Sequence, residues 1–121
     1  MTTERVDIHA DALNDAFARA IEIFIGRGFV APAYVDLPER GWKLGFEKHG
    51  AHWAFVVKVP AGDQTFETHL LQKSGLAIRN QAARKLADLL SACEAAQTGL
   101  LKQTRDAADA VERFITGARA T

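Results

Sequence analysis

Several features that would narrow the function quickly are missing from this sequence. Its single cysteine, Cys93, excludes an intramolecular disulfide and any metal site built on several cysteines. No apolar run approaches the ~18 residues that a membrane-spanning helix requires, so we expect no membrane contact. The N-terminal stretch MTTERVDIHADALND has no apolar segment of the kind found in signal peptides. We therefore expect a cytoplasmic protein.

An excess of charge of one sign is also missing. Fifteen basic and fifteen acidic residues cancel, which argues against a strongly basic face for nucleic acid. At 121 residues, 48% of them hydrophobic, the chain has an ordinary size for one domain with one core. We expect a single α+β domain over residues 1–121.

Signatures of catalysis and of nucleotide binding do not occur either. The motifs GxSxG, GxGxxG and GxxxxGK[ST] are absent, so neither a nucleophile elbow nor a phosphate-binding loop is predicted. Cys93 falls on the apolar side of a predicted helix, where a thiol is buried and inert. We expect a protein that is not an enzyme and uses no cofactor.

Two histidines, His49 and His52, stand in the stretch H-G-A-H between two alternating segments. If Gly50-Ala51 is a two-residue hairpin turn, their Cβ atoms face each other about 5 Å apart, close enough to share a metal. No supporting shell of further ligands is evident, however. We interpret the pair as solvent-exposed turn residues and predict no metal site.

Apolar residues at three- and four-residue spacing predict a first helix over residues 11–25. They are Leu13, Phe17, Ala20, Ile21 and Phe24. Gly26 and Gly28 are typical of a helix end. Residues 26–41, which include Tyr34, are predicted to be a long apolar loop that either covers the core or forms a binding surface.

Alternation with a period of two predicts a three-stranded antiparallel meander over residues 42–71. The turn at Gly50-Ala51 joins the first two strands through inward pairs, Phe46 with Phe55 and Leu44 with Val57. The turn at residues 60–64 adds a third strand, with Val59 opposite Phe66 and Lys58 opposite Glu67. In this register Phe66 and Leu70 face the core.

Residues 75–117 are predicted to be helical, with Ser74 as the N-cap. A 4-3-4-3 spacing, here called the heptad seam, links Leu86, Leu90, Cys93, Gln97, Leu100, Thr104, Ala107, Val111, Phe114 and Ala118. The seam passes Thr98-Gly99 in phase, which favours one continuous helix over two helices hinged there. Such a helix is about 60 Å long, whereas a strand spans about 20 Å. The far half of the seam then packs on the first helix or on another chain, and both options stay open.

Four cations gather near the start of this helical region: Lys73, Arg79, Arg84 and Lys85. Together with helix N-terminal amides they form a weak anion site. Arg79 falls on the apolar side, so its guanidinium needs a partner inside the chain or on another molecule.

These features favour a small non-enzymatic protein-binding module that acts on a partner protein or by self-association as a homodimer. Small bacterial accessory or inhibitor proteins from phages and mobile elements, anti-CRISPRs among them, have this profile. Two alternatives are a nucleic-acid-associated regulator that uses the four cations, and a small ligand-binding domain or enzyme without a recognisable motif. The candidate partner-binding residues are Lys73, Arg79, Arg84, Lys85, Tyr34, Leu100, Thr104 and Val111.

Overall fold

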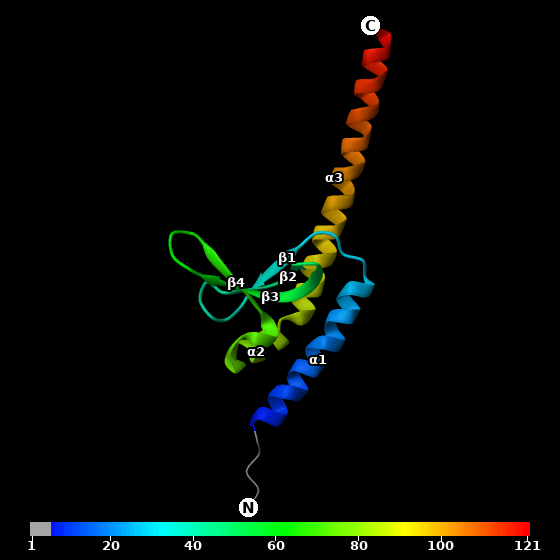
Figure 1. Ribbon diagram of the computed structural model, residues 1–121. Coiled ribbons are helices and arrows are strands. Elements are labelled where there is room, and N and C mark those ends of the chain that lie inside the picture. Colours follow the sequence, from blue (N-terminus) through cyan, green and yellow to red (C-terminus); the bar gives the residue numbers. More distant parts are fainter. Residues whose placement is uncertain (1–5) are drawn as a thin grey trace, which may run out of the picture.

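The computed structural model describes residues 6–121 (Figure 1). Residues 6–100 are here called the head, and the rest of the last helix projects from it. In chain order the elements are α1 (Val6–Gly26), β1 (Ala33–Asp36), β2 (Lys43–His49), β3 (His52–Pro60), β4 (Phe66–Leu70), the 3-10 helix η1 (Leu71–Lys73), α2 (Leu76–Ala83) and α3 (Leu86–Ala120). The predicted α+β class, with a helix before an antiparallel sheet and a long helix after it, is confirmed.

The sheet has four strands in the order β1-β2-β3-β4, one more than predicted. The extra strand, β1, lies within the segment expected to be a loop and pairs antiparallel with β2, with Tyr34 opposite Gly45 and Val35 opposite Leu44. Only four residues form it, two on each face, which is too few to display an alternation in the sequence.

The β2–β3 hairpin has the predicted register. Phe46 lies opposite Phe55, and His49 lies opposite His52 across the turn. Gly50 has a φ of 66°, as the first position of a type II′ turn requires. The interpretation of H-G-A-H as a hairpin turn is therefore confirmed.

The predicted register of β3 and β4 is wrong by one residue. Pro60 lies opposite Phe66, and Lys58 lies opposite Thr68 rather than Glu67. The connecting loop is closed by a hydrogen bond from the Ala61 N–H to the Thr65 carbonyl, 3.0 Å, and spans residues 61–65, one residue later than the expected 60–64. A one-residue slip moves every side chain to the other face. Phe66 is consequently 48% exposed on the outer face instead of buried.

Helix α1 begins at Val6, five residues before the predicted start, and extends to Gly26. Its end follows the prediction, because Gly28 adopts a φ of 70° and donates its N–H to the Ile25 carbonyl at 3.0 Å. The early start was not recognised because Val6 and Ile8 are exposed and add nothing to the apolar stripe.

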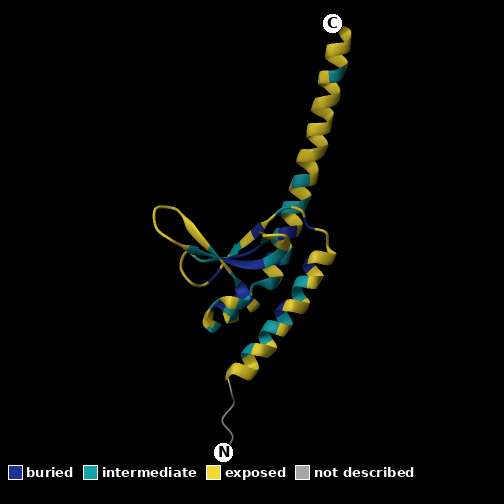
Figure 2. Ribbon diagram, in the orientation of Figure 1, coloured by how far each residue is buried: buried dark blue, intermediate teal, exposed yellow. Residues whose placement is uncertain are grey.

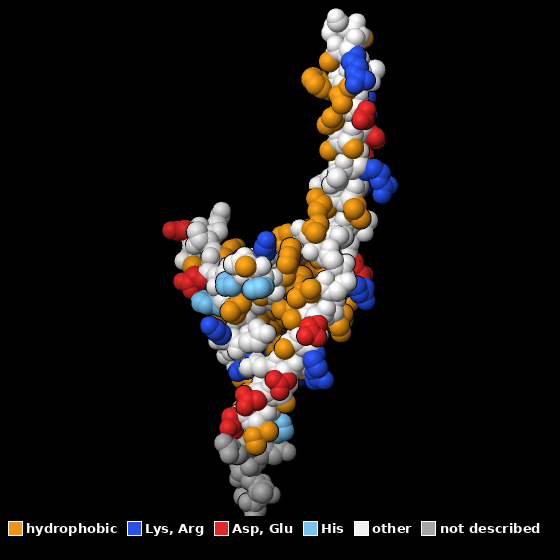
Figure 3. Space-filling view, turned by 45° about the vertical axis from the view of Figure 1, so that its right-hand side comes forward, with side chains coloured by type: hydrophobic (Ala, Val, Ile, Leu, Met, Phe, Trp, Pro, Cys, Tyr) orange, Lys and Arg blue, Asp and Glu red, His pale blue; other side chains and the backbone are white. Residues whose placement is uncertain are grey.

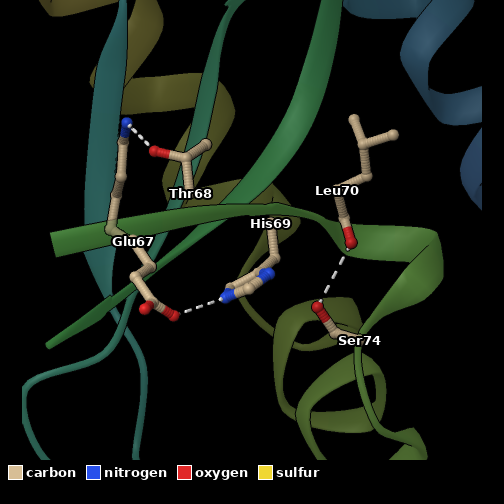
Figure 4. A network of polar contacts seen from close by, with 6 residues as sticks. Glu67, Thr68, His69, Leu70 and Ser74 are labelled. Carbon is tan, nitrogen blue, oxygen red and sulfur yellow. Dashed lines mark hydrogen bonds and ion pairs between the residues drawn. The ribbon is translucent and has the colours of Figure 1, made fainter. Parts of the chain in front are cut away.

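The C-terminal region is helical but interrupted at a place that the sequence does not mark. Helix α3 runs through Gly99 without a break, so the continuous helix is correct there and the hinge is not. The chain bends instead at Arg84-Lys85, between α2 and α3. Ser74 is not the N-cap; Gly75 is, and the Ser74 hydroxyl donates to the Leu70 carbonyl at 3.2 Å (Figure 4).

The core lies between the inner face of the sheet and the helices (Figure 2). Five phenylalanines from α1, the following turn, β2 and β3 contact one another edge to face or tilted: Phe17, Phe24, Phe29, Phe46 and Phe55. Leu89 and Cys93 cover this cluster from the first half of α3. Burying Ile78 of α2 and Leu89 of α3 in one core explains why the chain bends between them.

Candidate functional site

The last 20 residues of α3, here called the projecting helix, extend beyond the head and contact none of it (Figures 1 and 2). Every residue from 101 to 120 is exposed except Ile115, which is half-buried. At 1.5 Å per residue this segment is about 30 Å long. Most helical stability in proteins comes from tertiary packing of one face, and this segment has no such packing.

One face of the projecting helix is apolar and continues the face that packs on the sheet. Cys93, Leu100, Ala107 and Phe114 follow one another at intervals of seven and so lie on one line of the helix. Cys93 is fully buried against the sheet, whereas Phe114 is 72% exposed. Figure 3 shows apolar side chains along one edge of this helix and charged ones along the opposite edge.

The charged residues of the projecting helix all avoid this face. If Leu100 is placed at position d of a heptad, they occupy only positions b, c and f: Lys102, Arg105, Asp106, Asp109, Glu112, Arg113 and Arg119. Positions a, d, e and g hold no charge, which gives a stripe wider than an a/d seam alone. Such a pattern is typical of a helix that packs on one or more other helices.

Three large apolar side chains are left in water on this stripe. Leu101 and Val111 are each 55% exposed, and Phe114 is more so. Fully burying a side chain of this kind contributes about 1.5–3 kcal/mol relative to leaving it exposed. Covering the stripe would therefore stabilise both the contact and the helix itself.

The base of α3 is fixed to the head by polar contacts as well as by the core. The Gln97 side-chain oxygen accepts the Val30 N–H at 3.1 Å, and its amide nitrogen donates to the Gly28 carbonyl at 3.3 Å. Arg27 forms a 2.7 Å ion pair with Glu94. These contacts explain the polar residue in the seam and fix the direction in which the projecting helix leaves the head.

A second group of polar residues lies on the outer face of the sheet. The Tyr34 hydroxyl donates to a Glu47 carboxylate oxygen at 2.7 Å, and the same oxygen lies 2.8 Å from the Lys58 ammonium. Lys58 also donates to Thr68 at 2.6 Å. Gly45 makes room for the tyrosine, because a Cβ there would lie 2.3 Å from Tyr34 Cδ1.

These contacts shift two pKa values. Burial raises the pKa of Tyr34 to about 12, with a further contribution from the Glu47 carboxylate that accepts its hydrogen bond. Burial alone would raise the pKa of Glu47, but hydrogen bonds from Lys58 and Tyr34 outweigh it and the pKa is lowered. Tyr34 therefore stays protonated and Glu47 ionised at neutral pH.

A shallow hollow of about 260 Å³ lies beside this network, lined by Tyr34, Lys43, Lys58 and Phe66. It is smaller than the roughly 300–1,000 Å³ of typical ligand pockets. Its lysines are already paired, Lys43 with Asp36 at 2.6 Å and Lys58 with Glu47. The hollow therefore lacks both the volume and the uncompensated charge of a built anion or ligand site.

Two of the four predicted cations have partners within the chain. Arg79 donates to the Asn14 side-chain oxygen of α1 at 3.0 Å, and its Nε is buried without a hydrogen-bond partner. The partner that Arg79 requires is thus an amide of the same chain. Lys85 approaches Asp88 at 3.8 Å, whereas Lys73 and Arg84 are exposed.

The part of the chain that the structure describes shows neither a metal site nor a membrane-spanning helix. His69 contacts Glu67 at 3.2 Å, and both residues belong to β4 (Figure 4). Residues 6–121 contain no group of three or more His, Cys, Asp or Glu side chains arranged to hold a metal ion. None of the helices in that range combines the length and apolar character needed to cross a membrane.

The predicted partner-binding residues therefore fall in three separate places. Leu100, Thr104 and Val111 lie along α3, Tyr34 lies on the outer sheet face, and the cations lie around α2. Sequence reasoning missed the outer network of Glu47, Lys58 and Thr68. The strand that brings Tyr34 to Glu47 was not predicted, and the slip in register had placed Thr68 on the inner face. Comparison of the chain with known protein families, curated proteins and solved structures finds no match.

Proposed function

We propose that this chain is a small non-enzymatic protein-binding module whose binding surface is the apolar face of the projecting helix. The observation that carries the proposal is that the heptad seam keeps its spacing beyond the head. The side of α3 that covers the sheet up to Leu100 continues, uncharged and uncovered, to Ala118. A sequence that keeps an apolar face over this distance beyond the head needs a second surface to cover it.

The reactive groups of the head support a role without catalysis. Cys93 is fully buried, and burial raises the pKa of its thiol to about 11, so a nucleophilic thiolate is disfavoured. The carboxylate and ammonium groups of the outer sheet face are held in ion pairs with each other. These groups stabilise the sheet and leave the projecting helix as the surface for function.

Photo-crosslinking in cells that naturally produce the chain tests this proposal. A benzophenone side chain replaces either Phe114, on the apolar face, or Thr116, on the opposite face two residues away. We expect a protein adduct from position 114 and little from position 116, with mass spectrometry identifying the second protein. Equal yields at both positions, or none at position 114, would contradict the proposal.

The nucleic-acid alternative stays a prediction that rests on Lys73, Arg79, Arg84 and Lys85. It is not favoured, because Arg79 is committed to Asn14 and Lys85 approaches Asp88. Binding to DNA or RNA that falls steeply with salt would support it. The relation to inhibitors from phages and mobile elements likewise stays a prediction from size and composition.

A further inference from the structure

We infer that the partner of the projecting helix is the same helix of a second copy, packed antiparallel around a two-fold axis at the level of Asp109. The inference rests on the proposed function, since it names what covers the same surface. Two independent features carry it: the sizes of the seam residues, and the side of α3 on which the head lies.

The sizes of the seam residues are complementary in antiparallel order. With residue 109 at the centre, each layer places a large side chain against a small one: Leu100 on Ala118, Phe114 on Thr104, and Val111 on Ala107 of the second copy. Facing large and small residues fill the space between helices well. Parallel order would place Phe114 on Phe114 and Ala107 on Ala107, which overpacks one layer and leaves a cavity in another.

The flanking positions agree with the same centre. Leu101 then lies two residues, about 3 Å along the axis, from the level of Ile115 of the second copy, so that the two apolar side chains can cover each other. Ala108 and Ala110 each face their own counterpart near the axis, where small residues permit a close approach of the helices. The charged residues stay at positions b, c and f in water, so the contact desolvates none of them.

The head restricts the direction of the second helix. It lies against the seam side of α3, where Leu89 and Cys93 are buried. A parallel copy lying on that side of the projecting helix would need its own head in the space that the first head occupies. An antiparallel copy has its head at the opposite end. Its Ala118 reaches the level of Leu100, where the first head stops, and only its last three residues extend further, alongside residues 97–99.

Light scattering on the purified full-length protein tests whether a second copy covers the projecting helix. We expect twice the 13.2 kDa of the chain at high micromolar concentration. Phe114→Asp should shift the mass to that of one chain. Thr116→Asp is the matched control, because it adds the same charge on the opposite face and should leave the mass doubled. Trp fluorescence checks that the head stays folded, as expected for an exposed side chain.

Spin labels attached to the Arg119→Cys variant test whether the two helices pack antiparallel or parallel. Antiparallel packing centred at residue 109 places residue 119 beside residue 99 of the second copy, so two labels lie about 30 Å apart along the axis. Parallel packing would bring them side by side. The native Cys93 is buried and should not be labelled in the folded protein.

Each outcome distinguishes this inference from the proposed function. A single-chain mass for the full-length protein, or equal effects of Phe114→Asp and Thr116→Asp, overturns the second copy as partner. A short label distance overturns the antiparallel order. If the purified protein is monomeric while position 114 crosslinks to a different protein in cells, the binding surface stands and only its occupant is wrong.

Discussion

Phe114 lies three heptads beyond Cys93 on the same line of α3, yet Phe114 is 72% exposed and Cys93 fully buried. Cys93 lies on the part of α3 that packs on the sheet, whereas Phe114 lies on the projecting helix. A seam that only had to cover the sheet would lose its phase after Leu100, because nothing there would select for apolar residues. Its persistence to Ala118 is what distinguishes this chain from a head with a solvated tail.

Gly99→Ala should stabilise the protein. The position is inside α3 and exposed, and a Cβ there would meet nothing within 4 Å. Replacing a helical glycine by alanine contributes about 0.5–1 kcal/mol. Gly50→Ala is the matched control: its φ of 66° strains any residue with a Cβ, so the same change should destabilise. Chemical denaturation measures both, and a destabilised Gly99→Ala variant would mean that the chain turns at Gly99.

Gly45→Ala should destabilise the sheet by about 1–3 kcal/mol, as overpacking typically does. Its Cβ would lie 2.3 Å from Tyr34 Cδ1 and 2.6 Å from Cε1, so the ring must leave its place over β2 and lose its bond to Glu47. The same substitution in a Tyr34→Ala background should cost much less, because the ring is gone. Equal costs in the two backgrounds, measured by urea denaturation, would show that the clash with Tyr34 is not the cause.

Sequence patterns predicted the presence of α1, the β2–β3 hairpin and the continuity of α3 through Gly99 correctly, because each has many residues that report the same period. The seam predicted that α3 passes Gly99, and the alternation around Phe46 and Phe55 predicted their pairing. Strand β1 was missed because four residues cannot show a period. The bend at Arg84-Lys85 was missed because both residues are good helix formers, and only the packing of the helices around them breaks the helix.

The candidate site was predictable to a similar extent. Leu100, Thr104 and Val111 could be placed on one helix face from spacing alone. The outer network around Glu47 could not be predicted as a whole, because Tyr34 reaches Glu47 from the unpredicted strand β1. Thr68 joins the network only in the observed β3–β4 register, which a loop with positive φ at Gly62, Asp63 and Gln64 decides. The partner of Arg79 was also beyond reach, since Asn14 is 65 residues away and carries no charge to suggest a pair.

Cys93 should resist alkylation in the native protein. Its thiol is buried, and burial together with nearby Glu94 raises its pKa to about 11. At pH 8 the thiolate fraction is then on the order of 100-fold below that of a free thiol, and steric cover slows the reaction further. Iodoacetamide labelling followed by mass spectrometry should detect modification only after denaturation. Labelling should stay slow in the Phe114→Asp variant, because the sheet of the same chain buries Cys93. Fast labelling of Cys93 in that variant would show that a second chain, and not the sheet, protects the thiol.

Tyr34 is the only tyrosine, so absorbance at 295 nm during an alkaline titration reports its ionisation alone. The midpoint should lie at about 12 in the folded protein and near 10 in denaturant. A pKa raised by folding means that the native state holds its proton more tightly. Tyr34 therefore contributes stability that is complete below about pH 10 and is lost as the pH rises toward 12. Glu47→Gln should lower the midpoint without returning it to 10, because burial, the larger cause, remains. Glu67→Gln, on β4, is the control and should leave the midpoint unchanged. A wild-type midpoint near 10 would show that the ring is solvated and that its bond to Glu47 does not form.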